Sequence, residues 1–534
     1  MARRILTNWT VDLGDGPMEC TVPHAWRQDV DVRWEGPAVY RTRTKFPEAP
    51  ATLRFFGVSY EAIVKFNETE VAVHRGIWDA FDISSAGFEG QEVEIQVEVT
   101  KNGGEGFPVR DVLSGFLPYV FHTFGGIFRP VELLWEDLPK EPVAQDPWLV
   151  PVYVRGVLSW GWYPELGHAH PDLETIRREI KLAKDQGFNL IKFCLWLPPH
   201  EYLEELARQK MLAWLELPLW DPTDDPALQS EMALEIERIV LQYRHHPNVP
   251  FWTIGCELSS STSPAFRQSL YELVKNLVPH ALVKDNSGGA EMYGGDPQEF
   301  GDFDDFHPYC DTPFYPQVLE SLRLGARSPK LILLGEFNDI DVHRDIAWLA
   351  KDVPFWASPT AELNDKGVRW QYDLPEVLAS NRFCAIENEE RHHRLMESSI
   401  RKAIFMRKFV QERVRSTPDI SGYVVTGWRD TPISSSGFAD DFGEVRFPEA
   451  ETRKWNSGAC LFTLPNRQPP WINGGNRPGW TDSFNHFAGP ILIPIGVHSD
   501  RPIHGKLEWD VIRFSWGGKT KGRIDFGEAE PMDV

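Results

Sequence analysis

The stretch VPFWTIGCE, residues 249–257, is a run of strand-forming residues that ends on a glycine, a cysteine and a glutamate. Its apolar and β-branched residues are typical of a buried β-strand. An ionisable side chain at the end of an apolar strand costs free energy unless it is paired or used. The stretch therefore predicts a buried strand with a polar site at its last position, Glu257.

The same kind of run recurs along residues 151–430, where strand patterns alternate with amphipathic helix patterns. One helix pattern, DLETIRREIKLAKDQG, begins with a capping aspartate and ends with a glycine. The other strand patterns are VYVRGVLSW, NLIKFCLW, LAWLELPL, ALVKDNS, DDFHPY, KLILLGEF and ISGYVVTGW. Eight strands with intervening helices indicate a (β/α)₈ barrel with a parallel sheet.

The regions on either side of the barrel have different patterns. Residues 1–138 contain short alternating runs such as EAIVKFNE and QEVEIQVEVT, which predict a jelly-roll-like β-sandwich. Residues 139–150 are rich in proline and charge and are expected to be a linker. A long insertion, 337–390, follows the seventh strand, and 431–534 are expected to form an irregular Trp/Gly/Pro-rich extension. The expected fold class is multidomain, β followed by α/β.

Composition excludes several classes of partner and site. The chain has 534 residues, a net charge of −23 and a pI near 5.2, which argues against binding to nucleic acid or to an anionic membrane. No run of 18 apolar residues predicts a membrane span, and no signal-peptide pattern is visible, so a cytoplasmic location is expected. The six cysteines contain no C-x-x-C pair, which supports neither a zinc site nor a disulfide framework.

Two glutamates stand at strand ends that lie on the same rim of such a barrel. Glu257 ends the fourth strand and Glu336 ends the seventh. Barrel chemistry occurs at the C-terminal ends of the strands, and the fourth and seventh strands face each other across the mouth. Two facing carboxyl groups are what the hydrolysis of a glycosidic bond requires.

Further motifs resemble a known family. The stretches VPHAW, LRFFGVSYEAIVKFNE and GGIFRPVELLW resemble the sugar-binding β-sandwich of glycoside hydrolase family two. GFNLIKF, RHHPNVPFWTIGCELS, DFHPY, LLGEF and GYVVTGWRD resemble its barrel motifs, so the resemblance covers residues 20–135 and 151–430. The family includes β-galactosidases, β-glucuronidases, β-mannosidases and exo-β-glucosaminidases. The resemblance implies a retaining, exo-acting β-glycosidase with a carbohydrate substrate and no metal or organic cofactor.

The resemblance also implies roles for individual residues. Glu257 matches the acid/base and Glu336 the nucleophile of the family. His307 and Tyr309 match the pair that borders the nucleophile, and Trp428 matches the tryptophan that forms the floor of the sugar pocket. Asp430, just beyond it, is a candidate for hydrogen bonds to sugar hydroxyls.

Two positions depart from the family pattern. Cys256 stands where the family usually has an asparagine that binds the sugar 2-hydroxyl, and a thiol is a poor donor and acceptor. Lys192 replaces an arginine of the second strand. Three explanations are open: a glycone altered at C2, a contact supplied from elsewhere such as Trp196 or Glu216, or loss of activity.

The architecture departs as well, because the short linker leaves no room for the immunoglobulin-like middle domain of the family. The insertion is the better candidate for a lid, and the extension is a second candidate for shaping the pocket or meeting another subunit. Family habit and the apolar extension favour a homodimer. A catalytically inactive carbohydrate-binding protein and a transglycosidase are the alternatives. The sugar, the linkage and the aglycone are not specified by these motifs.

Overall fold

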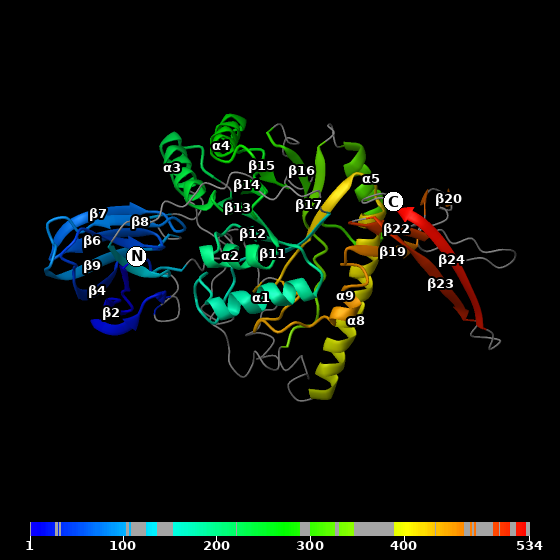
Figure 1. The fold of residues 1–534 in the computed structure, drawn as a ribbon, viewed down its shortest axis with the longest axis horizontal. Helices are drawn as coiled ribbons and strands as arrows, with labels where there is room; N and C mark the ends of the chain where they lie inside the picture. The colour runs from blue at the N-terminus through cyan, green and yellow to red at the C-terminus, as the bar shows by residue number, and fades with distance from the viewer. Residues whose placement is uncertain are drawn as a thin grey trace.

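The computed structural model places a β-sandwich at the N-terminus, a barrel in the middle and further strands at the C-terminus (Figure 1). The structure describes residues 2–529 apart from 27–29, 31–33, 103–105, 108–123, 136–152, 221, 289–299, 326–329, 346–388, 433, 464–469, 472–474, 477–494, 501 and 513–518. The expected linker 139–150 and most of the insertion 337–390 lie outside the described residues.

The sandwich consists of two antiparallel sheets, as predicted. One has the order β1-β10-β5-β8 and the other β3-β2-β4-β9-β6-β7. In β9 (Glu92–Thr100) the apolar side chains alternate with polar ones, so every second residue enters the core between the sheets. The other strands are β1 (Ala2–Ile5), β2 (Asn8–Asp12), β3 (Pro17–Thr21), β4 (Ala38–Lys45), β5 (Ala51–Phe55), β6 (Glu61–Phe66), β7 (Thr69–Arg75), β8 (Phe81–Ser84) and β10 (Val131–Trp135).

The barrel contains the eight predicted strands, all parallel, in the order β15-β14-β13-β12-β11-β18-β17-β16. The outer members of this ladder, β15 and β16, contact each other, which closes the sheet. The strands are β11 (Val154–Ser159), β12 (Leu190–Cys194), β13 (Leu212–Leu219), β14 (Phe251–Cys256), β15 (Leu282–Ser287), β16 (Phe303–Phe306), β17 (Leu331–Phe337) and β18 (Ile420–Val425). Their C-terminal ends therefore share one rim.

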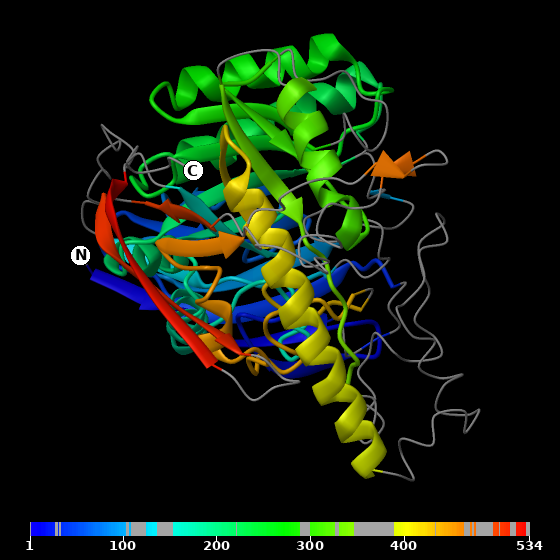
Figure 2. The same ribbon diagram turned by 90° about the vertical axis from the view of Figure 1, so that its right-hand side faces the viewer.

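Helices cover the outside of the barrel. Asp172 caps α1 (Leu173–Asp185) by accepting a hydrogen bond from the Thr175 amide at 2.7 Å. The other helices are α2 (His200–Arg208), α3 (Pro226–Tyr243), α4 (Pro264–Leu277), the short η3 (Thr312–Phe314), α5 (Tyr315–Gly325) and the long α8 (Glu389–Ser416), which Figure 2 shows along its length. None of the described helices is both long enough and apolar enough to cross a membrane.

Several residues of the sandwich pack into the barrel core, while the core between the two sheets forms a separate cluster. Trp78 of the sandwich contacts Phe128 edge-on, with ring centroids 5.7 Å apart, and Trp196 of the barrel, with centroids 6.5 Å apart. Arg129, which is 3% exposed, donates to the Trp78 carbonyl, to the Tyr243 hydroxyl at 3.1 Å and to the Leu197 carbonyl. One buried guanidinium thus joins the two domains.

The C-terminal extension differs from the irregular segment that was expected. It contains α9 (Glu449–Thr452), β19 (Ala459–Thr463), β20 (Pro470–Trp471), β21 (Gly475–Asn476), β22 (Ile495–Ser499), β23 (Ile503–Ile512) and β24 (Lys519–Ala529). β23 and β24 form a hairpin whose charged residues and glycines hide the alternation typical of a strand. The labelled strands of the extension, from β19 to β24, are drawn in orange and red at the end opposite the sandwich, whereas α9 lies beside the barrel (Figure 1).

Part of the extension is attached to the end of the barrel away from the rim that carries Glu257 and Glu336. Arg155, near the start of β11, pairs with Asp500, and the Tyr153 ring lies 4.3 Å from the ring of His498 on β22. This strand therefore does not cover the barrel mouth. The stretch from 477 to 494 lies outside the described residues.

We expect Arg129→Met to lower the free energy of unfolding by about 2–4 kcal/mol, because it leaves buried carbonyl groups without a donor. Urea unfolding followed by tryptophan fluorescence measures this. Arg54→Met is the matched control, since Arg54 pairs with Asp82 on the partly exposed surface of the sandwich and contributes under about 1 kcal/mol. Equal losses in the two variants would contradict the joining role of Arg129.

Candidate active site

The two predicted carboxylates lie on the same rim of the barrel. Glu257 directly follows β14 with a φ of 48°, and its amide donates to the Ser287 carbonyl at 2.8 Å. A left-handed backbone at a residue other than glycine carries strain, which is common at functional sites. Glu336 lies within β17 and is 3% exposed.

His307 lies between the two carboxylates. One oxygen of Glu257, one of Glu336 and a ring nitrogen of His307 all lie within 4.8 Å of one another. The Nδ1 atom of His307 is 2.9 Å from Oε1 of Glu257 and 3.9 Å from Oε2 of Glu336. Burial alone would lower the pKa of His307, but the charge of Glu336 and the hydrogen bond with Glu257 raise it to about 9. His307 is therefore protonated at neutral pH.

Tyr309 holds the second oxygen of Glu336. Its hydroxyl donates to Oε2 of Glu336 at 2.8 Å and lies 2.9 Å from the Thr426 hydroxyl. Burial, together with the charge of Glu336, raises the pKa of Tyr309 well above its ordinary value. The phenol therefore keeps its proton and stays a donor to the carboxylate.

Lys192 supplies the positive charge beneath the carboxylates. Its fully buried Nζ is 2.7 Å from Oε2 of Glu216 and 3.9 Å from Oε1 of Glu336, and it donates to the Ser287 hydroxyl at 2.7 Å. Burial alone would lower the pKa of Lys192, but Glu216, Asp305 and Glu336 hold it well above its ordinary value. Burial raises the pKa of Glu336, and His307 and Lys192 oppose that shift.

Two thiols contact the first oxygen of Glu336. The Sγ of Cys256 is 3.7 Å from Oε1 of Glu336, and the Sγ of Cys194 is 3.5 Å from the same oxygen. Cys194 also donates to Oε1 of Glu216 at 2.7 Å. Burial raises the pKa of Cys194 well above its ordinary value, so its thiol is a neutral, weak donor at neutral pH.

The predicted tryptophans lie in different surroundings. Trp428, three residues beyond β18, lines a small cavity together with Trp160, Trp162 and Tyr163. Trp196 is fully buried, donates from its indole to the Ser159 carbonyl at 2.9 Å and packs in the core that joins the domains. Contacts of either ring with a sugar stay predictions.

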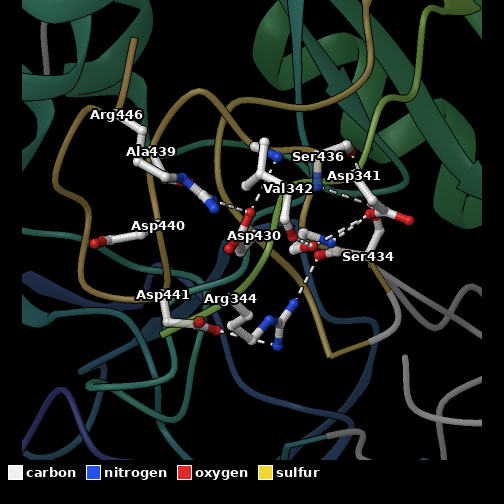
Figure 3. Close-up of polar contacts among 12 residues, drawn as sticks. Asp341, Val342, Arg344, Asp430, Ser434, Ser436, Ala439, Asp440, Asp441 and Arg446 are labelled. Carbon is white, nitrogen blue, oxygen red and sulfur yellow. Dashed lines mark hydrogen bonds and ion pairs between the residues drawn. The ribbon is translucent and has the colours of Figure 1, made fainter. Parts of the chain in front are cut away.

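Asp430 is engaged with protein groups. It pairs with Arg446 and accepts a hydrogen bond from the Gly437 amide at 3.0 Å. Figure 3 shows Arg446 pointing at Asp430, and Arg344 pointing at Asp441, to which it is joined at 3.5 Å. Burial raises the pKa of Asp430 to about 7. The network ties the start of the insertion to the segment after β18, and a sugar contact by Asp430 stays a prediction.

Several residues of the site were not singled out from the sequence. Ser287 bridges the site, because its hydroxyl donates to Asp305 at 2.6 Å and lies 2.9 Å from Nε2 of His307. Cys194 and Thr426 contact Glu336 and Tyr309 as described above. Cys194 and Ser287 are the last residues of their strands, and Asp305 is the last residue but one. Their positions at or next to the ends of predicted strands could have identified them from the sequence.

Three groups of side chains in the described part of the chain have the spacing of metal ligands. They are Glu257, His307 and Glu336; Cys194, Glu216, Cys256 and Glu336; and, away from the rim, His200, His245 and His246. The first two share Glu336. The third contains a close pair, since Nδ1 of His200 is 2.9 Å from Nε2 of His246.

Comparison with known proteins confirms the resemblance for the fold. No family model matches the chain. It is 28% identical over 155 residues to β-galactosidase 2 of Enterobacter cloacae, a match that spans 27% of this chain and 15% of that enzyme.

Solved structures are similar over much more of the chain. A GH2 β-galacturonidase from Eisenbergiella tayi, bound to galacturonate, aligns with a TM-score of 0.64 at 15% identity over 85% of this chain and 97% of its own. A β-D-mannosidase from Dictyoglomus thermophilum aligns with a TM-score of 0.67 at 11% identity over 100% and 86%. The chain therefore has the fold of these glycosidases.

We expect Lys192→Met to cost about 3–5 kcal/mol of unfolding free energy, because it leaves Glu216 buried without its cation. The double variant Lys192→Met/Glu216→Met should recover part of that loss, since it removes both charges of the pair but leaves Glu336 and Asp305 without the lysine. Urea unfolding of the two single variants and the double variant measures the coupling. Strictly additive losses would contradict a direct interaction between the two side chains.

We expect stability to fall as the pH rises from about 6.5 to about 9, because protonated His307 is favoured in the folded state. The raised pKa of His307 adds to the free energy of unfolding. This stabilisation is fully present below the pKa of His307 in the unfolded chain and is lost as the pH rises through its pKa in the folded protein. It amounts to up to about 3 kcal/mol. Denaturant unfolding at several pH values measures it, and His307→Gln should flatten the slope. An unchanged slope in that variant would show that other groups titrate.

Proposed function

We propose that this protein is a retaining, exo-acting β-glycosidase that hydrolyses terminal sugars by double displacement. The observation that carries the proposal is the approach of Glu257 and Glu336, which have oxygens within 4.8 Å of each other. Retaining glycosidases hold their two carboxyl groups about 5–5.5 Å apart, whereas inverting ones leave about 6.5–9.5 Å for a water molecule. An oxygen–oxygen approach of this size is compatible with the retaining separation, and it supports direct attack by a carboxylate.

In the first step Glu336 attacks the anomeric carbon while Glu257 gives a proton to the departing oxygen. The glycosidic bond breaks and an ester between the sugar and Glu336 forms. In the second step Glu257 takes a proton from water, which attacks the anomeric carbon and releases Glu336. Tyr309 and Lys192 favour this release, because a donor and a cation near Glu336 stabilise the returning negative charge.

The residues around Glu336 also support a particular kind of glycone. Cys256 and Cys194 present two thiols beside the nucleophile, where a free sugar hydroxyl would find only weak partners. We therefore propose a glycone altered at C2, such as a 2-amino or 2-acetamido sugar. The solved relatives are described as enzymes for galacturonides and mannosides, and none of these names decides the sugar for this chain.

The test is a panel of 4-nitrophenyl β-glycosides that covers galactose, glucose, glucuronic acid, mannose, glucosamine and N-acetylglucosamine. Wild type, Glu257→Gln and Glu336→Gln are assayed in parallel. We expect one sugar to be hydrolysed, and kcat to fall at least about a thousandfold in Glu336→Gln. Turnover that survives in Glu336→Gln would overturn the assignment of the nucleophile.

Added azide distinguishes the proposed acid/base role of Glu257 from the proposed nucleophile role of Glu336. In Glu257→Ala a good leaving group departs without an acid, and the ester on Glu336 then waits for a nucleophile. Azide should raise turnover and yield a β-glycosyl azide, which NMR identifies. An α-glycosyl azide would contradict double displacement. If every sugar of the panel binds and none is hydrolysed, the protein is a carbohydrate-binding protein on this scaffold.

A further inference from the structure

The floor of the candidate active site contains a set of metal-type ligands, of which only Glu336 reacts in the proposed hydrolysis. Cys194, Glu216, Cys256 and Glu336 are all buried, and one donor atom from each lies within 4.8 Å of the other three. We propose that these four residues bind a thiophilic divalent cation of the zinc class, and that this binding blocks the nucleophile.

The spacing of the donors agrees with a tetrahedral site. Zinc binds thiolate sulfur at about 2.3 Å and carboxylate oxygen at about 2.0–2.2 Å, so neighbouring donors of a tetrahedron lie about 3.3–3.8 Å apart. The sulfurs of Cys194 and Cys256 are 3.5 and 3.7 Å from Oε1 of Glu336. The 2.7 Å contact between Cys194 and Glu216 is a hydrogen bond, which opens when the thiol loses its proton.

The strands of the barrel hold the four ligands in place before a cation binds. They come from four different strands, β12, β13, β14 and β17, and Cys194 is paired in register with Glu216. Side chains on rigid strands lose little freedom on binding, which favours a site that needs no rearrangement. Two sulfurs and two oxygens suit zinc or cadmium rather than magnesium or calcium, which prefer oxygen alone.

The charges nearly balance, with one negative charge left over. Binding releases one proton from each thiol to solvent, and the resulting two thiolates and two carboxylates carry four negative charges. The cation and Lys192, which lies 2.7 Å from Oε2 of Glu216, supply three positive charges. Oε2 of Glu216 can thus keep its ion pair while Oε1 binds the cation. The cation occupies Oε1 of Glu336 and withdraws negative charge from the whole carboxylate, while Tyr309 holds Oε2, so attack on a sugar is suppressed.

The test is a titration of the full-length protein with Cd²⁺ under anaerobic conditions, followed by the ultraviolet charge-transfer absorption of cadmium thiolates. Wild type should saturate at one equivalent. Cys194→Ser/Cys256→Ser should bind Cd²⁺ more than about a hundredfold more weakly and lose the band, because a ligand contributes more than the outer-shell groups that alone change affinity 10–100-fold. Cys20→Ser/Cys460→Ser is the matched control, with two cysteines outside the site, and should keep the band.

X-ray absorption of the unaltered protein with one equivalent of Zn²⁺ tests the proposal without any variant. Two sulfur and two oxygen neighbours are expected. A shell of nitrogen and oxygen alone would assign the ion to one of the two groups that contain histidine and overturn the proposal, as would an equal cadmium band in both double variants.

The expected inhibition by the bound cation rests on the proposed function. The metal site and the glycosidase activity can nevertheless be tested separately. If a glycoside is hydrolysed, Zn²⁺ should abolish its turnover and a chelator should restore it; full activity of the zinc-loaded protein would overturn the block. If no glycoside is hydrolysed, the proposed function fails, while the cadmium band still decides whether the metal site exists.

Discussion

The buried ion pair between Lys192 and Glu216 is the interaction on which the rest of the site depends. Both side chains are inaccessible to solvent, and their charged atoms are 2.7 Å apart. Removing carboxylates from water is costly unless a cation accompanies them. The same ammonium lies 3.9 Å from Glu336 and also opposes the raised pKa of Asp305. The positive charge of Lys192 therefore allows several acidic side chains from neighbouring strand ends to be buried close together.

A hydrogen-bonded chain extends from this lysine to the second carboxylate. Ser287 accepts from Lys192 and contacts both Asp305 and His307, and His307 in turn reaches Glu257. The proposed acid and the proposed nucleophile are thus connected through one imidazole between them. A change of charge on either carboxylate alters the proton affinity of His307, which would couple the two steps of the proposed double displacement.

Both the N-terminal sandwich and the C-terminal extension pack against the barrel. The sandwich adds Trp78 and Arg129 to the barrel core, and strand β22 is tied to the opposite side through the Arg155–Asp500 pair and through Arg415, which lies 2.8 Å from Nδ1 of His498. The segment after β18 is fastened separately by Asp430 and Arg446 (Figure 3).

The order of apolar runs and helix patterns was enough to predict the sandwich, the eight parallel strands and the strand-end positions of Glu257 and Glu336, because strand and helix periodicities are local properties of a sequence. The partners of those glutamates were harder to predict. Cys194, Ser287 and Asp305 lie far apart in the chain, and only the closure and stagger of the barrel bring them together. The side-chain direction of Trp196 likewise follows from packing between distant segments, and the pairing of Asp430 with Arg446 follows from the path of the segment after β18. Which strand ends meet is fixed by the register of the whole sheet, and no short stretch of residues contains that information.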